Sequence, residues 1–242
     1  MLAENSDSNT VSLSSVLVLG ATGIVGTHII SELIRRQIPV VAVSRRPLHH
    51  EDASVTWHQA DLSDPEQLAT LPKCPAVIAT TPIWLTSKVV GSNLSDPDGC
   101  RLVAFSSSSA LTKANASNAA ERDLALKLRH SEDQLLSQTP QVRTTIFRPT
   151  MIYGGPRDAN VERIAAALRR CSVFPIVGGG KGIRQPVHAA DLGIAAVAAL
   201  LTPDTEGKIY VLAGGEKLSV KEMVRRVGAL NGVRTRFIPV PR

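Results

Sequence analysis

The sequence predicts an α/β fold in which helices cover both faces of a parallel sheet. Short apolar runs alternate with longer amphipathic segments from Ser15 to Leu212, which is the order expected of successive strand–helix units. The first apolar run ends in a turn with three glycines, Gly20–Gly26, and a helical pattern follows at once. The 242 residues are enough for one such domain with a small appendage. Aromatic residues make up only 3% of the chain, so the core must be built from Val, Ile, Leu and Ala.

The first half of the chain holds most of the expected strands. Apolar, β-branched runs predict strands over Ser15–Gly20, Pro39–Ser44, Val55–Gln59, Ala76–Thr80, Leu102–Ser106 and Arg143–Phe147, the last stopped by Pro149. Helical patterns are seen over Gly23–Gln37, over Pro65–Thr70 with Asp64 as its N-cap, and over the charged, amphipathic stretch Ala119–Gln138.

The sequence pattern changes after Tyr153, where predicted loops become frequent. Helices are expected over Val161–Arg170, Ala190–Leu201 and Val220–Leu230, the last capped by Ser219, and extended pieces over Arg184–His188, Ile209–Leu212 and Thr235–Val240. Gly178–Gly180 is expected to be a flexible loop. We therefore divide the chain into a disordered leader (1–14), a dinucleotide-binding core (15–155) and a C-terminal substrate-side region integrated with the core (156–242).

Composition excludes several classes of protein. The three cysteines are far apart and form no CxxC or Cys/His cluster, so no metal site or disulfide framework is expected. No apolar run approaches the about 20 residues of a membrane span, and the polar N-terminus has no basic region of a signal peptide. The formal charge of +6 is spread along the chain, which favours anionic small ligands, with nucleic acid as the weaker alternative. These features predict a cytoplasmic protein with a small-molecule substrate and neither a membrane nor a nucleic-acid partner; they predict no oligomeric state.

The glycine turn predicts a dinucleotide site. Its GxxGxxG spacing lets the backbone approach a pyrophosphate, and the helix start offers N–H groups and a positive dipole end. The alternative is a turn that only packs a helix on a strand. The residues expected at the cofactor are Gly20, Ala21, Thr22, Gly23, Ile24, Val25 and Gly26.

The end of the second strand distinguishes the two nicotinamide cofactors. NAD-binding folds place a carboxylate there for the adenine ribose, whereas this chain has Ser44-Arg45-Arg46, which suits a 2′-phosphate. We therefore predict NADP as the cofactor, with NAD as the alternative. In the non-functional interpretation, the two arginines are solvated side chains of a surface loop. Asp61-Leu62, after the third strand, is expected either to bind the adenine amino group or, through Asp61, to cap the next turn.

Five ordered motifs within residues 15–215 resemble one family. They are GATGIVG at Gly20–Gly26, ADL at Ala60–Leu62, FSSSS at Phe105–Ser109, FRPTMIYGG at Phe147–Gly155 and RQPVHAADL at Arg184–Leu192. Together they resemble the extended NAD(P)-dependent epimerases and dehydratases of the short-chain dehydrogenase/reductase superfamily. The resemblance implies a Rossmann core, a doubly wound parallel sheet, with a small C-terminal substrate lobe.

The resemblance also implies roles for individual residues. Ser108 matches the catalytic Ser or Thr beside the nicotinamide. Tyr153 and Arg184 match positions on the substrate side, Tyr153 as a packing aromatic and Arg184 as a phosphate-gripping arginine. His188 matches the junction between a strand and a helix, a position that is usually structural. We therefore favour a partly buried histidine with satisfied hydrogen bonds over a catalytic base. The remaining cofactor-lining matches are Ala79, Thr80, Thr81, Ser106, Pro149, Thr150 and Met151.

One departure from the family is large. Its acid/base pair, a Tyr followed four residues later by a Lys, should lie on the helix after the serine strand, and this chain has no tyrosine there. Counting back from Glu132, which resembles the family's helix glutamate, puts Leu124 near the Tyr position and Leu128 near the Lys position. Lys127 lies one residue from the expected Lys position and is a candidate for the contact with the nicotinamide ribose; Lys113 is another. The alternative for Lys127 is a solvated side chain with no role in the site.

Two functions follow from this pattern. The first is an NADP-dependent oxidoreductase or epimerase/dehydratase-like enzyme of the atypical short-chain dehydrogenase type, acting on a small carbonyl or sugar-like substrate. The second is an NmrA-like redox sensor or scaffold that binds NADP(H) without turnover. Because the chain stops soon after Phe237, where many extended members continue, a smaller substrate than a nucleotide sugar is expected.

Overall fold

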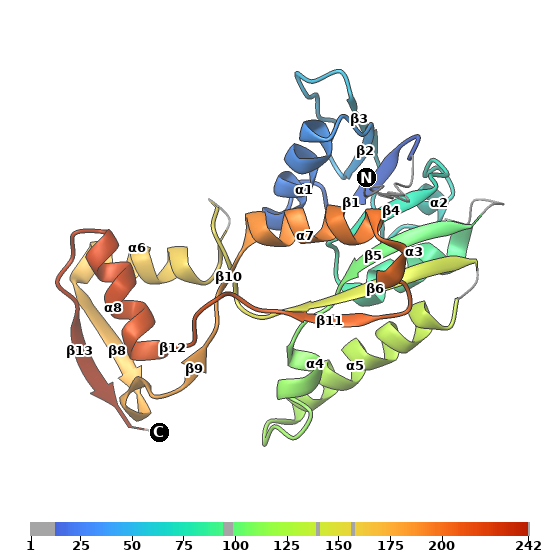
Figure 1. Cartoon of the computed structure of the whole chain (residues 1–242). Helices are drawn as coiled ribbons and strands as arrows, with labels where there is room; N and C mark the ends of the chain where they lie inside the picture. The colour runs from blue at the N-terminus through green and yellow to red at the C-terminus, as the bar shows by residue number, and fades with distance from the viewer. Residues whose placement is uncertain (1–12, 94–98, 139–140, 156–157, 242) are drawn as a thin grey trace, which may run out of the picture.

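The computed structural model describes residues 13–93, 99–138, 141–155 and 158–241. Most of the predicted leader therefore lies outside the described residues. A seven-stranded parallel sheet forms the centre, in the order β11-β6-β5-β4-β1-β2-β3 (Figure 1). Its strands are β1 (Val16–Leu19), β2 (Val40–Ser44), β3 (Val55–Gln59), β4 (Ala76–Ala79), β5 (Cys100–Phe105), β6 (Val142–Pro149) and β11 (Ile209–Leu212). The predicted doubly wound fold is confirmed.

Helices cover both faces of this sheet. On one face lie α1 (Ile24–Arg35) and α7 (Ala189–Leu201), and on the other α2 (Pro65–Leu68), α3 (Ile83–Asn93) and α5 (Ala119–Leu136), with the short α4 (Ser109–Thr112) against α5. Strand β1 shows why two cores form. Val16 and Val18 point into the core under α1 and α7, while Leu17 and Leu19 point into the other, because successive strand residues face opposite ways.

The sheet order reverses between β1 and β4. Strand β1 pairs with β2 on one side and with β4 on the other, in register from Val16↔Val40 and Val16↔Ala76. Ligands of open α/β sheets bind in the crevice outside the carboxyl ends of the strands at such a point. The glycine turn follows β1 directly, so the fold puts it in that crevice.

A small lobe stands to one side of the core (Figure 1). It contains α6 (Val161–Cys171), α8 (Val220–Leu230), the parallel pair β8 (Val173–Val177) and β13 (Arg236–Val240), and the 3-10 turn η1 (Gly178–Gly180). Its own apolar cluster centres on Leu168 and Val224. Short strands join it to the core: β7 (Ile152–Tyr153) pairs with β10 (Val187–His188), and β9 (Ile183–Arg184) with β12 (Leu218–Ser219).

The lobe does not take up the whole C-terminal region. Helix α7, the following 3-10 turn η2 (Pro203–Thr205) and β11 come after residue 155 yet pack on the core, with β11 forming one edge of the central sheet. The domain boundary at residue 155 therefore remains a prediction. In space, the chain leaves the core after β7, returns for α7 and β11, and leaves again.

Several boundaries differ from the expected ones. The predicted strand Arg184–His188 is two strands, β9 and β10, with different partners. Strand β6 continues through Pro149 instead of stopping before it. The caps agree with expectation: the Asp64 carboxylate accepts from the Glu66 N–H at 3.0 Å, and the Ser219 hydroxyl from the Glu222 N–H at 3.1 Å.

Candidate functional site

The glycine turn is closed and tightly packed. The Gly23 N–H donates to the Gly20 carbonyl at 2.9 Å, and Gly20 has φ +78°, a conformation that disfavours a side chain. A Cβ on Gly20 would lie 2.5 Å from the Thr80 hydroxyl, and one on Gly26 would lie 2.3 Å from the Gly20 carbonyl oxygen. The turn therefore brings the N-terminus of α1 directly to the crevice, with its first-turn N–H groups facing outward.

Thr80 links this turn to the neighbouring strand. Its Oγ1 lies 3.2 Å from both the Leu19 and Gly20 carbonyl oxygens, and its own N–H donates to Leu19 at 2.9 Å. Ala79 is fully buried at the end of β4, and the Thr81 hydroxyl is 3.0 Å from that of Thr86. The predicted segment Ala79–Thr81 therefore lies beside the glycine turn, on the far side of the crevice.

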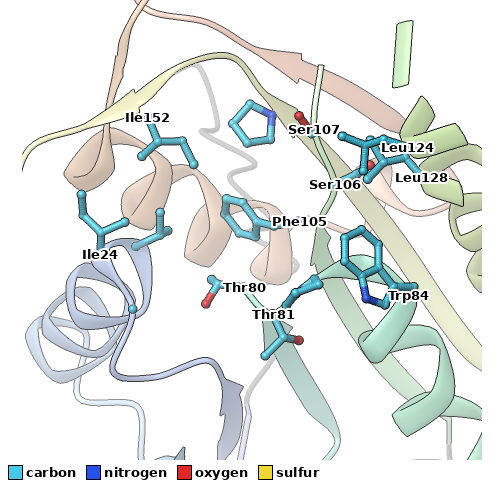
Figure 2. A pocket seen from close by; sticks show the side chains of 14 residues that line it. Ile24, Thr80, Thr81, Trp84, Phe105, Ser106, Ser107, Leu124, Leu128 and Ile152 are labelled. Atoms are coloured by element: carbon cyan, nitrogen blue, oxygen red, sulfur yellow. The ribbon is translucent and has the colours of Figure 1, made fainter. Parts of the chain in front are cut away.

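A cavity of about 380 Å³ opens between the glycine turn and the ends of β4 and β5 (Figure 2). Ile24 and Ile152 lie on one side of it and Trp84, Leu124 and Leu128 on the other. The other lining residues are Gly23, Val25, Thr80, Thr81, Pro82, Phe105, Ser106, Ser107 and Pro149. None of the described lining residues has an ionisable side chain. A flat ring with few charges fits such a wall, and the adjoining helix N-terminus suits a pyrophosphate.

The two leucines occupy the wall where the family pattern would put the tyrosine and the lysine. Leu124 and Leu128 face this cavity from α5, with Leu128 almost fully buried. Lys127 does not line the cavity. It is exposed, and its Nζ lies 4.0 Å from the centre of the Trp84 ring, a cation–π contact on the outer side of the cavity wall.

A buried ion pair supports the serine end of β5. The Glu132 carboxylate is 1% exposed and accepts hydrogen bonds from Arg148 Nε, at 2.9 Å, and from Arg148 Nη2. It also accepts from the Ser106 hydroxyl. The hydrogen bonds from Arg148 to this carboxylate raise the pKa of Arg148 further above its ordinary range. Ser106 is thereby turned toward Glu132, which leaves the neighbouring serines to face a ligand.

A second, polar cavity of about 890 Å³ lies between the core and the lobe. Ser107 and Ile152 line both cavities, so the two meet there. Its lining includes Ser108 and, from the predicted sites, Thr150, Met151 and Arg184; the others are Ser109, Thr112, Lys113, Asn160, Ile183 and Gln185. The Lys113 ammonium pairs with Glu121 at 2.9 Å. Hydroxyls and cations make this cavity suited to a polyhydroxylated or anionic molecule.

The predicted 2′-phosphate residues lie where β2 ends. Arg45 and Arg46 are exposed, and the Arg46 N–H donates to the Ser44 hydroxyl at 3.2 Å. Asp61 Oδ1 accepts from the N–H and hydroxyl of Ser63 at 2.9 and 2.6 Å, as expected of a turn cap. Those bonds lower the pKa of Asp61, and the charge of Arg45 adds to the effect. Leu62 is buried beneath this turn.

The tyrosine and histidine of the later motifs pack against each other. Tyr153 and His188 meet edge to face, with ring centroids 5.1 Å apart. His188 caps α7, because its Nδ1 accepts from the Ala190 N–H at 3.1 Å. A Cβ on Gly154 would lie 2.1 Å from His188 Nε2. Tyr153 lines neither cavity, so the packing interpretation agrees with its position and a substrate contact remains a prediction.

Trp84 was missed by the sequence analysis, although it forms much of one cavity wall. No helix was expected after β4, so α3 and its first-turn tryptophan had no predicted place. The signal was Thr81-Pro82, directly before an apolar triplet, since proline is common at the start of a helix.

The comparison with known families agrees with the predicted resemblance. Residues 16–122, from β1 to the first turn of α5, match the model of the "NAD dependent epimerase/dehydratase family". This part of the chain is similar to that family. The predicted relationship is therefore confirmed for the portion that contains the glycine turn, the segment Ala79–Thr81 and the serine strand. Motifs after residue 122 lie beyond the match.

The curated relatives of this chain are distant. The UDP-glucose 4-epimerase of Vibrio cholerae is 22% identical over 258 aligned positions, covering 94% of this chain and 79% of the relative. The mitochondrial NADH dehydrogenase [ubiquinone] 1 alpha subcomplex subunit 9 of Arabidopsis thaliana is 29% identical over 113 positions, 46% of this chain and 27% of that protein.

Solved structures share the fold at low identity. MoeE5 in complex with UDP-glucose and NAD has a TM-score of 0.74 at 21% identity, covering 94% of this chain and 85% of that chain. The UDP-glucose 4-epimerase of Thermus thermophilus in complex with NAD has a TM-score of 0.70 at 18% identity, covering 94% and 86%. The Rossmann fold shared with these solved structures thus extends over nearly the whole chain.

Two kinds of feature are absent from the described residues. No helix in those ranges has the length and apolarity needed to cross a bilayer. No group of three or more His, Cys, Asp or Glu residues there is arranged to hold a metal ion.

Proposed function

We propose that this chain binds a nicotinamide dinucleotide across the glycine turn, with the nicotinamide in the apolar cavity. The support is the turn itself, whose glycines leave room only for backbone, and the cavity that opens beside it. MoeE5 and the Thermus enzyme have NAD in their structures, in agreement with a cofactor of this class.

NADP is the preferred cofactor in this proposal. Arg45 and Arg46 follow β2, where a 2′-phosphate would lie, and Ser44 adds a hydroxyl. No carboxylate occupies the end of β2, although relatives of known structure hold NAD. The choice between the two cofactors therefore depends on the two exposed arginines.

Replacing both arginines with alanine should weaken NADP binding much more than NAD binding. Each charge-assisted phosphate contact is worth about 1.5–3 kcal/mol, or roughly ten- to a hundredfold in Kd. Titration calorimetry of the Arg45→Ala/Arg46→Ala variant with both cofactors measures this. Arg163→Ala, an exposed arginine on α6, is the control and should change neither Kd. An equal loss for both cofactors would refute the 2′-phosphate assignment.

The substrate of the proposed enzyme lies in the polar cavity. The observation that carries this is the meeting of the two cavities at Ser107 and Ile152, which places a molecule in one beside the end of the other. A bound nicotinamide supplies the hydride donor or acceptor. Ser108 is placed to hydrogen-bond a carbonyl or hydroxyl oxygen of a small carbonyl or sugar-like substrate, and Arg184 to bind an anionic group on it. The UDP-glucose 4-epimerases among the relatives, and MoeE5 with its bound UDP-glucose, support a sugar-like substrate.

A proton must be gained or lost at that oxygen during reduction or oxidation. Among the described residues lining the two cavities, Lys113 is the only one besides Arg184 with an ionisable proton. Lys113 is held by Glu121, so its ammonium is fixed at the cavity edge. In this proposal, Lys113 or water replaces the missing tyrosine as the proton donor.

Turnover tests this assignment directly. Purified protein is mixed with NADPH and a panel of small ketones, aldehydes and UDP-sugars, and absorbance at the nicotinamide band is followed. With a productive substrate, Ser108→Ala should reduce kcat by about a hundredfold, because hydrogen bonds to a developing oxyanion are worth that much. Lys113→Met should lower kcat and flatten its pH profile, while Lys127→Met, which only removes the Trp84 contact, should not. Tight binding of NADPH without its oxidation by any member of the panel would contradict the proposed enzymatic function.

The second candidate is a non-catalytic NADP(H) sensor or scaffold. It is favoured by one specific observation: Leu124 and Leu128 make the cavity wall apolar where the family pattern calls for acid/base groups. The relative named as a subunit of mitochondrial NADH dehydrogenase fits a role inside an assembly. This function requires a partner protein that binds the NADP-bound and NADPH-bound forms of this chain with different Kd values. Equal affinity of the partner for both forms would rule out the sensor.

A further inference from the structure

A groove of about 770 Å³ runs from the glycine turn along the outer side of α1. Ala21, Thr22, Gly23 and Ile24 of the turn line its inner end, and nothing above assigns a ligand to the rest of it. We call it the α1 groove. Its floor is the helix face with Thr27 and Ser31, and its far wall is the segment Leu48–His50 together with Trp57 of β3. Figure 1 shows this connection between β2 and β3 rising beside α1.

The α1 groove leads away from the cofactor crevice. It shares Gly23 and Ile24 with the apolar cavity, and Ile24 packs toward Gly155, where a Cβ would lie 3.2 Å from Ile24 Cγ1. From Ile24 to Ser31 the helix rises about 10 Å, at 1.5 Å per residue. Because α1 runs antiparallel to β1, that rise leads back from the carboxyl edge of the sheet, where Rossmann cofactors bind.

Imidazole rings are the main polar groups of the groove lining. Four imidazoles line it, those of His28, His49, His50 and His188, and none of the described lining residues is acidic. His50 Nδ1 accepts from the Asp52 N–H and His188 Nδ1 from the Ala190 N–H, both at 3.1 Å. With Nδ1 used as an acceptor, the neutral ring carries its hydrogen on Nε2, and that nitrogen can only donate. Such a lining calls for an acceptor-rich, acidic ligand.

Flat and apolar side chains form the rest of the wall. Trp57 presents an indole ring, and Leu48 and Ile30 add aliphatic surface. The Trp57 Nε1–H is buried and has no acceptor among the described residues, so it is the ring face of Trp57 that is offered to a ligand. An aromatic ring stacks well between indole and imidazole faces.

We infer that the α1 groove binds a planar molecule bearing an acidic group, of the mononucleotide class, independently of the dinucleotide. The ring lies against Trp57, and the phosphate or carboxylate accepts hydrogen bonds from the histidines. This inference does not depend on the proposed enzyme activity, because the groove and the apolar cavity have separate walls beyond Gly23 and Ile24.

The two tryptophans of the chain allow the sites to be read separately, since Trp84 lines the apolar cavity and Trp57 the groove. In Trp84→Phe, whose remaining tryptophan is Trp57, adenosine monophosphate should give saturable quenching of the emission. In Trp57→Phe it should give none. Adenosine, which lacks the phosphate, should bind at least tenfold more weakly. No saturable quenching of Trp57 at millimolar nucleotide overturns the inference.

Matched variants locate the site. His49→Leu/His50→Leu should raise the Kd for adenosine monophosphate at least tenfold, whereas His58→Leu, a histidine of β3 outside the groove, should not. Ser31→Trp should fill the groove and abolish mononucleotide binding while leaving NADP binding unchanged, both followed by titration calorimetry. Circular dichroism verifies that each variant is folded.

A competition experiment between NADP and adenosine monophosphate tests whether the α1 groove is independent of the dinucleotide site. With saturating NADP, the Kd for adenosine monophosphate should change less than threefold. A Kd that rises in proportion to NADP would show that the groove holds the adenosine end of the cofactor, and would overturn the separate site. Unchanged NADP binding in Arg45→Ala/Arg46→Ala, with mononucleotide binding intact, would instead fault the 2′-phosphate assignment alone.

Discussion

At the residue scale, the glycines of the turn are needed for different reasons. A side chain at Gly26 would collide with backbone, the Gly20 carbonyl at 2.3 Å, whereas one at Gly23 would lie 3.1 Å from that oxygen. Gly23 has φ −75°, which any residue adopts, and it lines the cavity. The fold therefore requires Gly26, whereas Gly23 is required only by the proposed binding of the dinucleotide.

Valine substitutions should separate these two requirements. Gly26→Val must displace the turn and should destabilise the protein by about 1–3 kcal/mol or more, as overpacking does. Gly23→Val should keep the melting temperature within about 4 °C of the natural protein, equivalent to roughly 1 kcal/mol at this size, and abolish dinucleotide binding. Thermal unfolding and NADP titration of both variants measure this; unchanged affinity in Gly23→Val would refute the pocket.

The sequence located the cofactor side of the site better than the catalytic side. Local turn chemistry defines the glycine motif, and its neighbour Thr80 follows from strand order, so both were predictable. The two leucines facing the cavity were predictable only by counting from Glu132. The Glu132–Arg148–Ser106 contacts depend on three elements meeting, β5, α5 and β6, which no local pattern reveals.

At the element scale, α1 holds its own buried carboxylate. Glu32 is 6% exposed and accepts from Arg35 Nε and Nη2, both at 2.7 Å, and from Arg36 Nε at 2.6 Å. The hydrogen bonds from Arg35 are the main cause that lowers the pKa of Glu32 from 4.5 to about 2, with Arg36 adding to it against the opposing effect of burial. The folded state thus favours the ionised form.

This shift sets a pH window for stability. Because the pKa is lowered in the folded state, the contribution of Glu32 is fully present above about pH 4.5 and is lost as the pH falls toward 2. Glu32→Gln should cost about 1–3 kcal/mol at pH 7, typical of hydrogen bonds to a charged group. Urea unfolding of both proteins at several pH values should show the difference shrinking below pH 4. A constant difference down to pH 2.5 would contradict the linkage.

Two elements escaped prediction for identifiable reasons. Helix α3 contains Thr86, Ser87, Val89 and Val90, residue types with modest helix propensity, and tertiary packing decides its structure. Strand β8 carries Pro175 in its interior, and its partner β13 lies some 60 residues later in the chain. Strands of the central sheet were predictable because both of their faces are buried, which makes them continuous apolar runs.

At the scale of the whole molecule, the lobe and the core differ in how much they bury. The core has two large apolar clusters, whereas the lobe has one small cluster, with Leu168 fully buried at its centre. Regions with few buried contacts open at lower free energy than the rest of a protein. The lobe should therefore open before the central sheet.

Leu168→Ala tests this ordering. Truncation of a buried leucine costs about 2–5 kcal/mol, and the cost should fall on the lobe. Hydrogen exchange measured by mass spectrometry should accelerate in α6, α8, β8 and β13, with β4 and β5 unchanged. Ala166→Gly, at an exposed position of the same helix, separates helix propensity from cavity formation. Uniform acceleration over the chain would show that lobe and core unfold as one unit.

The three passages of the chain between core and lobe have a mechanical consequence. They follow β7, precede α7 and follow β11, so the lobe is tethered at three places. A body held by one strand can swing freely, but three tethers leave little beyond a small rotation about the line joining them. Entry of a substrate into the polar cavity would then take place by a slight tilt of the lobe.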